Sequence, residues 1–430
     1  MVDRLDNSQD NFAAKFDDLL GAKREMSQDV DQTVREIIGN VIARGDGAVI
    51  DYTSRFDRLD LTSETLAISS AEIEQALSEV DQETFAALTL ARDRIEAHHM
   101  RQKPKDDRYT DPIGVELGSR WTAIESVGLY VPGGTASYPS SVLMNAVPAK
   151  VAGVERIVMV VPSPGGALNP LVLAAAHLAG VSEIYRIGGA QAIAALAYGT
   201  KTIKPVVKIV GPGNAYVAAA KRQVFGKVGI DMIAGPSEIL VVADNTNDPN
   251  WIAIDLLAQA EHDVSAQSIL ITDCAEFGDR VENAITSQLK TLPRKDIASA
   301  SWRDFGAIIK VDDFDQAPAL IDQIAPEHLE LAVDDPDALF DKVRNAGAVF
   351  LGRYTPEAVG DYVGGSNHVL PTARSARFSS GLSVLDFVKR TSILRCGPDQ
   401  LRQIGPAAIA LADAEGLDAH GRSVAARLNL

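Results

Sequence analysis

A glutamate and a histidine stand side by side in the segment Ala325-Pro326-Glu327-His328-Leu329-Glu330. Histidine is the side chain whose ordinary pKa lies near neutral pH, so it can take or give a proton under physiological conditions. A neighbouring carboxylate can act as a second base, or it can tune the first. In isolation, such a pair is more often part of a polar loop that follows a helix. Glu327 and His328 are therefore candidate catalytic residues whose role depends on the rest of the chain.

A second polar group closes a predicted helix over residues 251–262. The helix ends in Gln259-Ala260-Glu261-His262, and Gln259 and His262 are three residues apart, so they lie on one helical face. Zinc accepts both nitrogen and oxygen donors, which makes this spacing suitable for two ligands of one ion. The alternative is an ordinary polar face at the end of a helix.

Two further clusters carry groups that bind metals. The segment 360–371 contains Asp361, a hard oxygen ligand, and His368, a rival metal ligand that could equally hydrogen-bond the loop to itself. Glu415 and His420 lie near the end of the chain. Their position predicts a tail that docks at a polar site.

Glycine-rich turns follow several predicted strands. They are Tyr130–Gly134, Gly188–Gln191, Gly211–Asn214 and Ala234–Glu238. Glycine at such a turn lets a nucleotide or substrate approach the backbone closely. None of the turns is a GxGxxG fingerprint, because Tyr216 occupies the third position after Gly211 and Gly213. The turns permit a nucleotide site without identifying the nucleotide, and plain strand–helix turns remain the alternative.

The elements that must position these groups alternate between short apolar strands and small-residue helices. Strands are predicted near 157–161, 184–187, 206–210, 239–243, 269–272 and 308–311, and helices near 168–178, 190–197, 215–224 and 251–260. Apolar strands between helices are typical of parallel sheets that are covered on both faces. The first hundred residues are predicted to be helical. The chain is therefore an α/β protein with blocks at about 130–236 and 237–380.

Composition narrows the class of protein. A length of 430 residues predicts two or three domains. The net charge of -17 argues against a binder of nucleic acid or of anionic membranes. The two cysteines, Cys274 and Cys396, exclude a disulfide framework and a cysteine zinc site. Without an apolar signal or spanning segment, we expect a cytoplasmic protein.

Taken together, the motifs resemble one family, histidinol dehydrogenase, the zinc- and NAD-dependent enzyme of the last steps of histidine biosynthesis. The matching stretches, in chain order, are 130–134, 211–214, 234–238, 259–262, 326–329, 367–372 and 415–420. Any one stretch is weak evidence, whereas the ordered set is highly specific. A paralogous branch that oxidises sulfonated diols shares 259–262 and 327–330, but Asp361-Tyr362 and Ala325-Pro326 are more similar to the histidinol enzymes.

The resemblance implies a role for each matching residue. The zinc ligands, for one Zn2+ per subunit, would be Gln259, His262, Asp361 and His420. The catalytic pair would be Glu327 and His328. The substrate contacts would be Ser237 and Glu415, together with the zinc ligands and His328. The NAD contacts would be Tyr130, Gln191 and Asn214.

The resemblance also implies an architecture and a partner. We expect two Rossmann-like three-layer domains with parallel sheets, an N-terminal helical arm and a helical C-terminal tail. The expected boundaries are 1–21 for the arm, 22–129 with 237–381 for a discontinuous first domain, 130–236 for an NAD-binding second domain, and 382–430 for the tail. The partner would be a second copy, in a homodimer whose tails complete each other's sites.

The implied reaction has a consistent physical logic. L-histidinol carries an imidazole and an amine, both good zinc donors, so zinc would orient the substrate. His328 would take the hydroxyl proton in two successive oxidations, and Glu327 would activate water between them. Two other readings stay open at this point. The first is a zinc hydrolase with Glu327 as general base, and the second is a metal-stabilised scaffold without catalysis.

Overall fold

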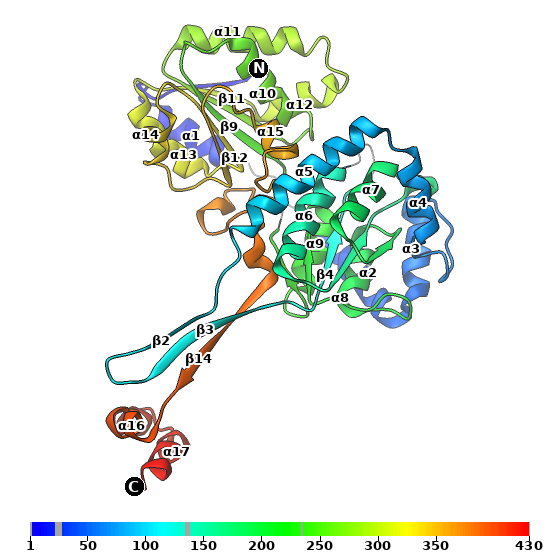
Figure 1. The fold of residues 1–430 in the computed structure, drawn as a ribbon. Coiled ribbons are helices and arrows are strands. Elements are labelled where there is room, and N and C mark those ends of the chain that lie inside the picture. Colours follow the sequence, from blue (N-terminus) through cyan, green and yellow to red (C-terminus); the bar gives the residue numbers. More distant parts are fainter. Residues whose placement is uncertain (1, 22–27, 134–137, 234, 430) are drawn as a thin grey trace.

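The computed structural model describes residues 2–21, 28–133, 138–233 and 235–429. Gly134 and Ala234, which belong to two of the glycine turns, and residue 22, the predicted start of the first domain, lie outside these ranges. Figure 1 shows two bodies of mixed helix and strand and a narrow extension that ends in the C-terminal helices. The predicted α/β class is confirmed.

One body is built around a five-stranded parallel sheet. Its spatial order is β6 (Glu183–Tyr185), β5 (Arg156–Val160), β4 (Ser126–Tyr130), β7 (Lys208–Val210) and β8 (Gly229–Ile230). The chain starts at the centre with β4, moves outward through β5 and β6, and then returns to the other side of β4 for β7 and β8. Such a reversal between β4 and β7 is a topological switch point, where open α/β sheets bind ligands at their carboxyl edge.

Helices cover both faces of this sheet. One face carries α6 (Pro139–Ala152) and α7 (Pro170–Ala179), with α4 (Ser70–Glu79) and α5 (Gln82–Met100) packed outside them. The other face carries α8 (Gly189–Tyr198) and α9 (Ala215–Val224), with α2 (Gln28–Arg44) and α3 (Asp46–Asp57). The predicted three-layer arrangement is confirmed. The helix α4 begins at a capping box formed by Ser69 and Glu72.

The second body repeats this plan around a six-stranded parallel sheet. Its spatial order is β1 (Asp3–Asp6), β11 (Ala307–Lys310), β10 (Gln267–Thr272), β9 (Glu238–Ala243), β12 (His328–Ala332) and β13 (Ala348–Leu351). One face is covered by α10 (Pro249–Ala260), α11 (Ala275–Gln288) and α12 (Lys295–Phe305). The other is covered by α1 (Phe12–Gly21), α13 (Ala317–Ile324) and α14 (Pro336–Phe340). Without β1, the strand order is that of the first sheet.

The N-terminal arm contains the predicted helix, α1, but it also contains the strand β1. Leu5 lies in the core, and β1 extends the sheet beyond β11. The helices α2 to α5 pack on the five-stranded sheet, whereas the predicted boundaries group residues 22–129 with 237–381. Those boundaries stay a prediction, and the packing favours placing α2 to α5 with the five-stranded sheet.

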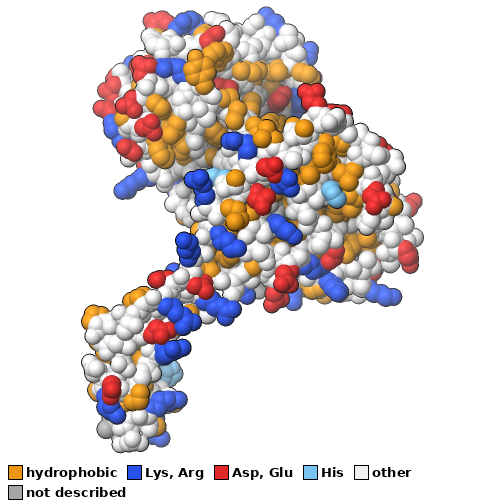
Figure 2. All heavy atoms as spheres, in the orientation of Figure 1, with side chains coloured by type: hydrophobic (Ala, Val, Ile, Leu, Met, Phe, Trp, Pro, Cys, Tyr) orange, Lys and Arg blue, Asp and Glu red, His pale blue; other side chains and the backbone are white. Residues whose placement is uncertain are grey.

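The extension is an antiparallel ribbon that carries the predicted helical tail. Its strands are β2 (Asp107–Thr110), β3 (Glu116–Ala123) and β14 (Val388–Arg395), followed by α16 (Pro398–Ala414) and α17 (Asp418–Leu428). Figure 2 shows hydrophobic side chains on the surface of this projection, and Leu394, Leu411 and Leu417 are among its exposed residues. Short helices complete the chain: η1 (Pro164–Gly166), η2 (Phe314–Gln316), α15 (Glu357–Tyr362), η3 (Ser375–Arg377) and η4 (Val384–Phe387). Among the described residues, no helix has the length and apolar composition needed to cross a membrane.

Candidate active site

Glu327 and His328 lie at the amino end of β12, beside β9. The chain turns into this strand at Ala325, whose left-handed φ of 48° ends α13. Both side chains are buried, and both bind the backbone of Glu238. The Glu238 N–H donates to Glu327 Oε2 at 2.9 Å, and His328 Nδ1 donates to the Glu238 carbonyl oxygen at 2.9 Å. One residue of the neighbouring strand therefore positions both members of the pair.

The contact with Glu238 also fixes the tautomer of His328. A carbonyl oxygen only accepts hydrogen bonds, so Nδ1 carries the proton and Nε2 keeps its lone pair. Nε2 is buried and has no hydrogen-bond partner among the described residues. Burial lowers the pKa of His328. Asp361 and the Glu238 carbonyl raise it, but their effect is smaller than that of burial. The imidazole is therefore neutral at neutral pH and can take a proton at Nε2.

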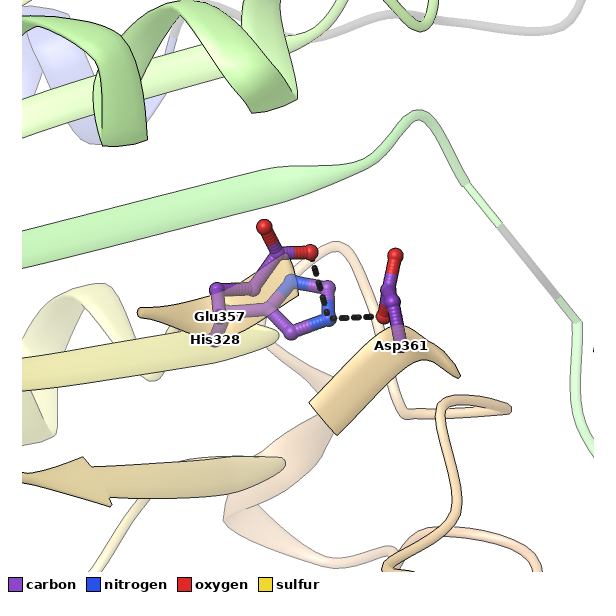
Figure 3. A group of neighbouring side chains, drawn as sticks. All are labelled: His328, Glu357 and Asp361. Atoms are coloured by element: carbon purple, nitrogen blue, oxygen red, sulfur yellow. Dashed lines mark ion pairs between the residues drawn. The ribbon is translucent and has the colours of Figure 1, made fainter. Parts of the chain in front are cut away.

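The Nε2 atom of His328 faces two carboxyl groups of α15 (Figure 3). It lies 3.7 Å from Glu357 Oε1 and 3.9 Å from Asp361 Oδ1. Burial, together with Asp361 and Glu330, raises the pKa of Glu357 to about 10. A divalent cation stabilises neighbouring carboxyl groups of this kind. The side chains of His328, Glu357 and Asp361 are close enough together to hold a metal ion.

The predicted ligands Gln259 and His262 lie at the carboxyl end of α10. Gln259 is 1% exposed, and its Oε1 has no partner among the described residues. An unpaired buried oxygen costs about 1–3 kcal/mol, so this atom favours a ligand. Burial is the main cause that lowers the pKa values of His328 and His368. The charge of His262 lowers both pKa values further, so His262 lies near these two histidines. Zinc accepts amide oxygen, imidazole and carboxylate, so Gln259, His262 and Asp361 have donor atoms of the types that zinc binds.

Two more acidic residues join the elements that carry the site. Glu330 follows His328 by two residues and so points to the same face of the sheet. Its Oε1 accepts a hydrogen bond from the Glu357 N–H at 2.6 Å, and its carboxyl group also hydrogen-bonds to Asp255 on α10. Burial, reinforced by Asp255, raises the pKa of Glu330 well above its ordinary value, whereas burial raises the pKa of Asp255 to about 6. At neutral pH a protonated Glu330 therefore donates to an ionised Asp255, and β12, α15 and α10 are held together.

The sequence prediction assigned no role to Glu330, Asp255 or Glu357, although each left a signal. Glu330 interrupts the apolar strand β12, and Asp255 interrupts the apolar helix α10. Glu357 stands one helical turn before Asp361. Charged residues in buried segments are rare unless they are paired, so an isolated charge in an apolar run indicates a buried polar partner.

His368 and Ser237 lie at the border of the site. His368 Nδ1 is 3.1 Å from the Asp361 carbonyl oxygen, and its Nε2 is 3.3 Å from Ser141 Oγ on α6. Of the two alternatives for His368, this geometry favours hydrogen bonding of the loop over metal binding. Ser237 is half-buried and directly precedes Glu238, so it lies next to the residue that holds the catalytic pair.

The predicted NAD contacts lie at the carboxyl edge of the five-stranded sheet. Tyr130 ends β4, and its hydroxyl oxygen accepts a hydrogen bond from the Gly189 N–H at 3.1 Å. Gln191, two residues further along α8, is buried, and its Oε1 has no partner among the described residues. Asn214 follows β7 and caps α9 by accepting from the backbone N–H of Tyr216. Tyr130 ends one of the two strands that flank the switch point, and Asn214 follows the other. The hydrogen bond between Gly189 and Tyr130 links this edge to the helix that carries Gln191, which supports a nucleotide site there.

Glu415 and His420 lie outside this cluster within a single chain. Glu415 follows α16, His420 belongs to α17, and both are exposed. Figure 1 shows these helices at the far end of the ribbon from α15 and β12. Their predicted roles at the zinc and the substrate therefore stay predictions.

Comparisons with known proteins agree with the motifs. A family model described as histidinol dehydrogenase matches residues 21–428. The chain is 70% identical over 430 residues to a histidinol dehydrogenase from Mesorhizobium japonicum, covering 100% of both proteins. It is also 70% identical over 430 residues to one from Rhizobium meliloti, covering 100% of this chain and 99% of that protein. The crystal structure of histidinol dehydrogenase from Elizabethkingia anophelis superposes with a TM-score of 0.95 at 37% identity, covering 100% of this chain and 98% of that chain. The chain therefore belongs to the histidinol dehydrogenase family.

Proposed function

We propose that this chain oxidises L-histidinol in two successive NAD-dependent steps, through L-histidinal to L-histidine. Membership of the family supports the substrate. The observation that carries the chemistry is His328, a buried and neutral imidazole whose Nδ1 is bound to Glu238 and whose Nε2 is left as a base. A base of this kind suits the removal of a proton from an alcohol.

The residues of the catalytic pair have separate tasks. When bound, zinc would hold the imidazole and amine of the substrate, and NAD would accept hydride from its alcohol carbon. His328 takes the hydroxyl proton at Nε2 in both oxidations. Glu327, held by the Glu238 N–H, activates water so that the aldehyde becomes the hydrate that the second oxidation requires. Two adjacent bases thus match a reaction of two oxidations and one hydration.

The zinc ligands in this proposal are Gln259, His262 and Asp361 of one chain and His420 of the partner subunit. The unpartnered Oε1 supports Gln259, and the position of its carboxylate 3.9 Å from His328 Nε2 supports Asp361. The exposed position of His420 on the projecting tail supports its donation to a second copy. We therefore propose a homodimer with exchanged tails, in which Glu415 also reaches the substrate of the partner. We also propose a cytoplasmic location.

A direct test mixes the zinc-loaded protein with L-histidinol and NAD and follows NADH absorbance. Two NADH per L-histidinol are expected from the intact protein, and none from a His328→Ala variant. A His98→Ala variant is the matched control, because His98 is an exposed histidine on α5. If the folded, zinc-loaded protein forms no NADH, the proposal is wrong, and the result favours the zinc hydrolase alternative.

A further inference from the structure

A buried ion pair lies beneath the glycine turn that follows β7. Lys221 of α9 and Asp231 after β8 form it, and their side chains are only 2% and 1% exposed. Lys221 Nζ also donates to the Gly211 carbonyl oxygen at 2.9 Å, and Asp231 Oδ2 accepts from the Gly211 N–H at 2.8 Å. The same ion pair therefore holds both backbone polar groups of one glycine.

Gly211 needs these partners because the chain leaves the sheet at this residue. It directly follows β7, it is buried, and its φ is 110°. A Cβ atom added here would lie 2.2 Å from the Tyr130 carbonyl oxygen, so only glycine fits. Buried backbone groups outside a ladder must find other partners, and Lys221 and Asp231 supply both.

Core packing alone does not require charges at these two positions. Two buried ions lose their hydration. Replacing them with apolar side chains of similar volume often leaves the folded protein as stable as before, or makes it more stable. An apolar pair could not hydrogen-bond to the main chain of Gly211. The ion pair is therefore better matched to fixing the shape of a loop than to stabilising the domain.

The loop that is held in this way lies at the switch point of the sheet. Gly211 contacts the end of β4 at Tyr130, and the loop continues to Asn214 at the start of α9. The buried, unpartnered Oε1 of Gln191 lies close to Gly189, which Tyr130 binds. A shift of Gly211 would move the backbone that a dinucleotide must approach closely.

We propose that Lys221 and Asp231 are positioning residues for the dinucleotide: their ion pair clamps Gly211 and sets the shape of the loop 211–214, without contacting the dinucleotide. This inference rests on the proposed NAD-dependent function. It predicts that removing the ion pair weakens NAD binding in a protein that still folds.

The test replaces both charges with apolar side chains in the double variant Lys221→Met/Asp231→Leu of the full-length, zinc-loaded protein. The melting temperature should fall, because the two backbone groups of Gly211 lose their partners, but circular dichroism should still show a cooperative unfolding transition above the assay temperature. The dissociation constant for NAD, measured by calorimetry, should rise on the order of tenfold or more, which corresponds to about 1.4 kcal/mol. The KM for NAD should rise in parallel, with little change in kcat or in the affinity for L-histidinol.

A matched control removes another ion pair from the same sheet. Arg156 pairs with Glu183 at the amino ends of β5 and β6, and Glu183→Gln should leave NAD affinity unchanged. A folded double variant that binds NAD like the wild type overturns the inference. If the double variant does not fold, Asp231→Ala, which removes the acceptor for the Gly211 N–H, is measured against the same tenfold threshold. Failure of the proposed function looks different, because the wild type itself would then not bind NAD.

Discussion

Replacing Glu330 with glutamine tests how the site is held together. In the native chain, Glu330 accepts from the Glu357 N–H at 2.6 Å and shares a hydrogen bond with Asp255. Burial and the adjacent Asp255 raise the pKa of Glu330 well above its ordinary 4.5. A glutamine keeps the accepting oxygen and supplies a permanent donor to Asp255, so Glu330→Gln should preserve both contacts.

The magnitude follows from the proton that the folded chain must retain. Above pH 4.5 the unfolded chain releases this proton while the folded chain keeps it. The contribution of Glu330 to stability is therefore complete below that pH and declines by about 1.4 kcal/mol per pH unit as the pH rises towards the raised pKa. Glu330→Gln should therefore be more stable than the wild type at pH 7, by a difference that grows by up to about 1.4 kcal/mol per pH unit between pH 5 and pH 7, and nearly equal to it close to pH 4.5.

Urea unfolding of the zinc-saturated protein at pH 5 and pH 7 measures this difference. The contrasting variant Glu330→Leu removes both contacts and leaves two buried polar groups without partners. Since each costs about 1–3 kcal/mol, it should be destabilised at both pH values. A Glu330→Gln variant that gains no stability relative to the wild type between pH 5 and pH 7 would contradict the retained proton. A Glu330→Leu variant as stable as Glu330→Gln would contradict the two contacts.

Three further predictions concern the base, the tail and the metal. Because burial lowers the pKa of His328, kcat/KM should be lost only as the pH falls below the ordinary histidine value of 6.5. A pH–rate profile whose acid limb is centred above that value would contradict the assignment of His328 as the base. Mixing chains that carry His328→Ala with chains that carry His420→Ala should restore about one quarter of wild-type activity, since half of randomly formed dimers are mixed and each has one complete site; no recovery would mean that the tails are not exchanged. Chelation of zinc should abolish activity while the far-ultraviolet circular dichroism spectrum is largely kept, whereas unfolding on chelation would favour the scaffold alternative.

The sequence predicted the repeating core because buried parallel strands leave a strong signal. The continuous apolar run at 239–243 becomes β9 and the run at 157–161 becomes β5, each enclosed by helices on both faces. The shared strand order of the two sheets was not readable, since periodicity indicates which residues are buried but not which strands are neighbours.

The ribbon escaped prediction for the opposite reason. Every residue of β2 is exposed, and β14 has no buried residue in its eight positions. Without one buried face, a strand shows no alternation of apolar and polar residues. The segment 388–395 was therefore included in a tail that was predicted to be mostly helical.

The candidate site was only partly readable, for a related reason. Glu327 and His328 stood out as adjacent polar residues, but their shared anchor, the backbone of Glu238, is a contact that side-chain types cannot reveal. The link from Glu330 to Asp255 depends on the register of β12 against β9 and on the helix that covers that face. Such contacts join segments far apart in the sequence, so motif spacing carries no information about them.

The division of labour between Glu327 and His328 is the central claim, and a single-turnover experiment with Glu327→Gln tests it most directly. The zinc-loaded variant is mixed in excess with L-histidinol and NAD, and NADH and L-histidinal are followed with time. The first NADH should form at nearly the wild-type rate and the second should be strongly slowed, so that L-histidinal accumulates. Equal loss of both oxidations would contradict separate roles for the two residues.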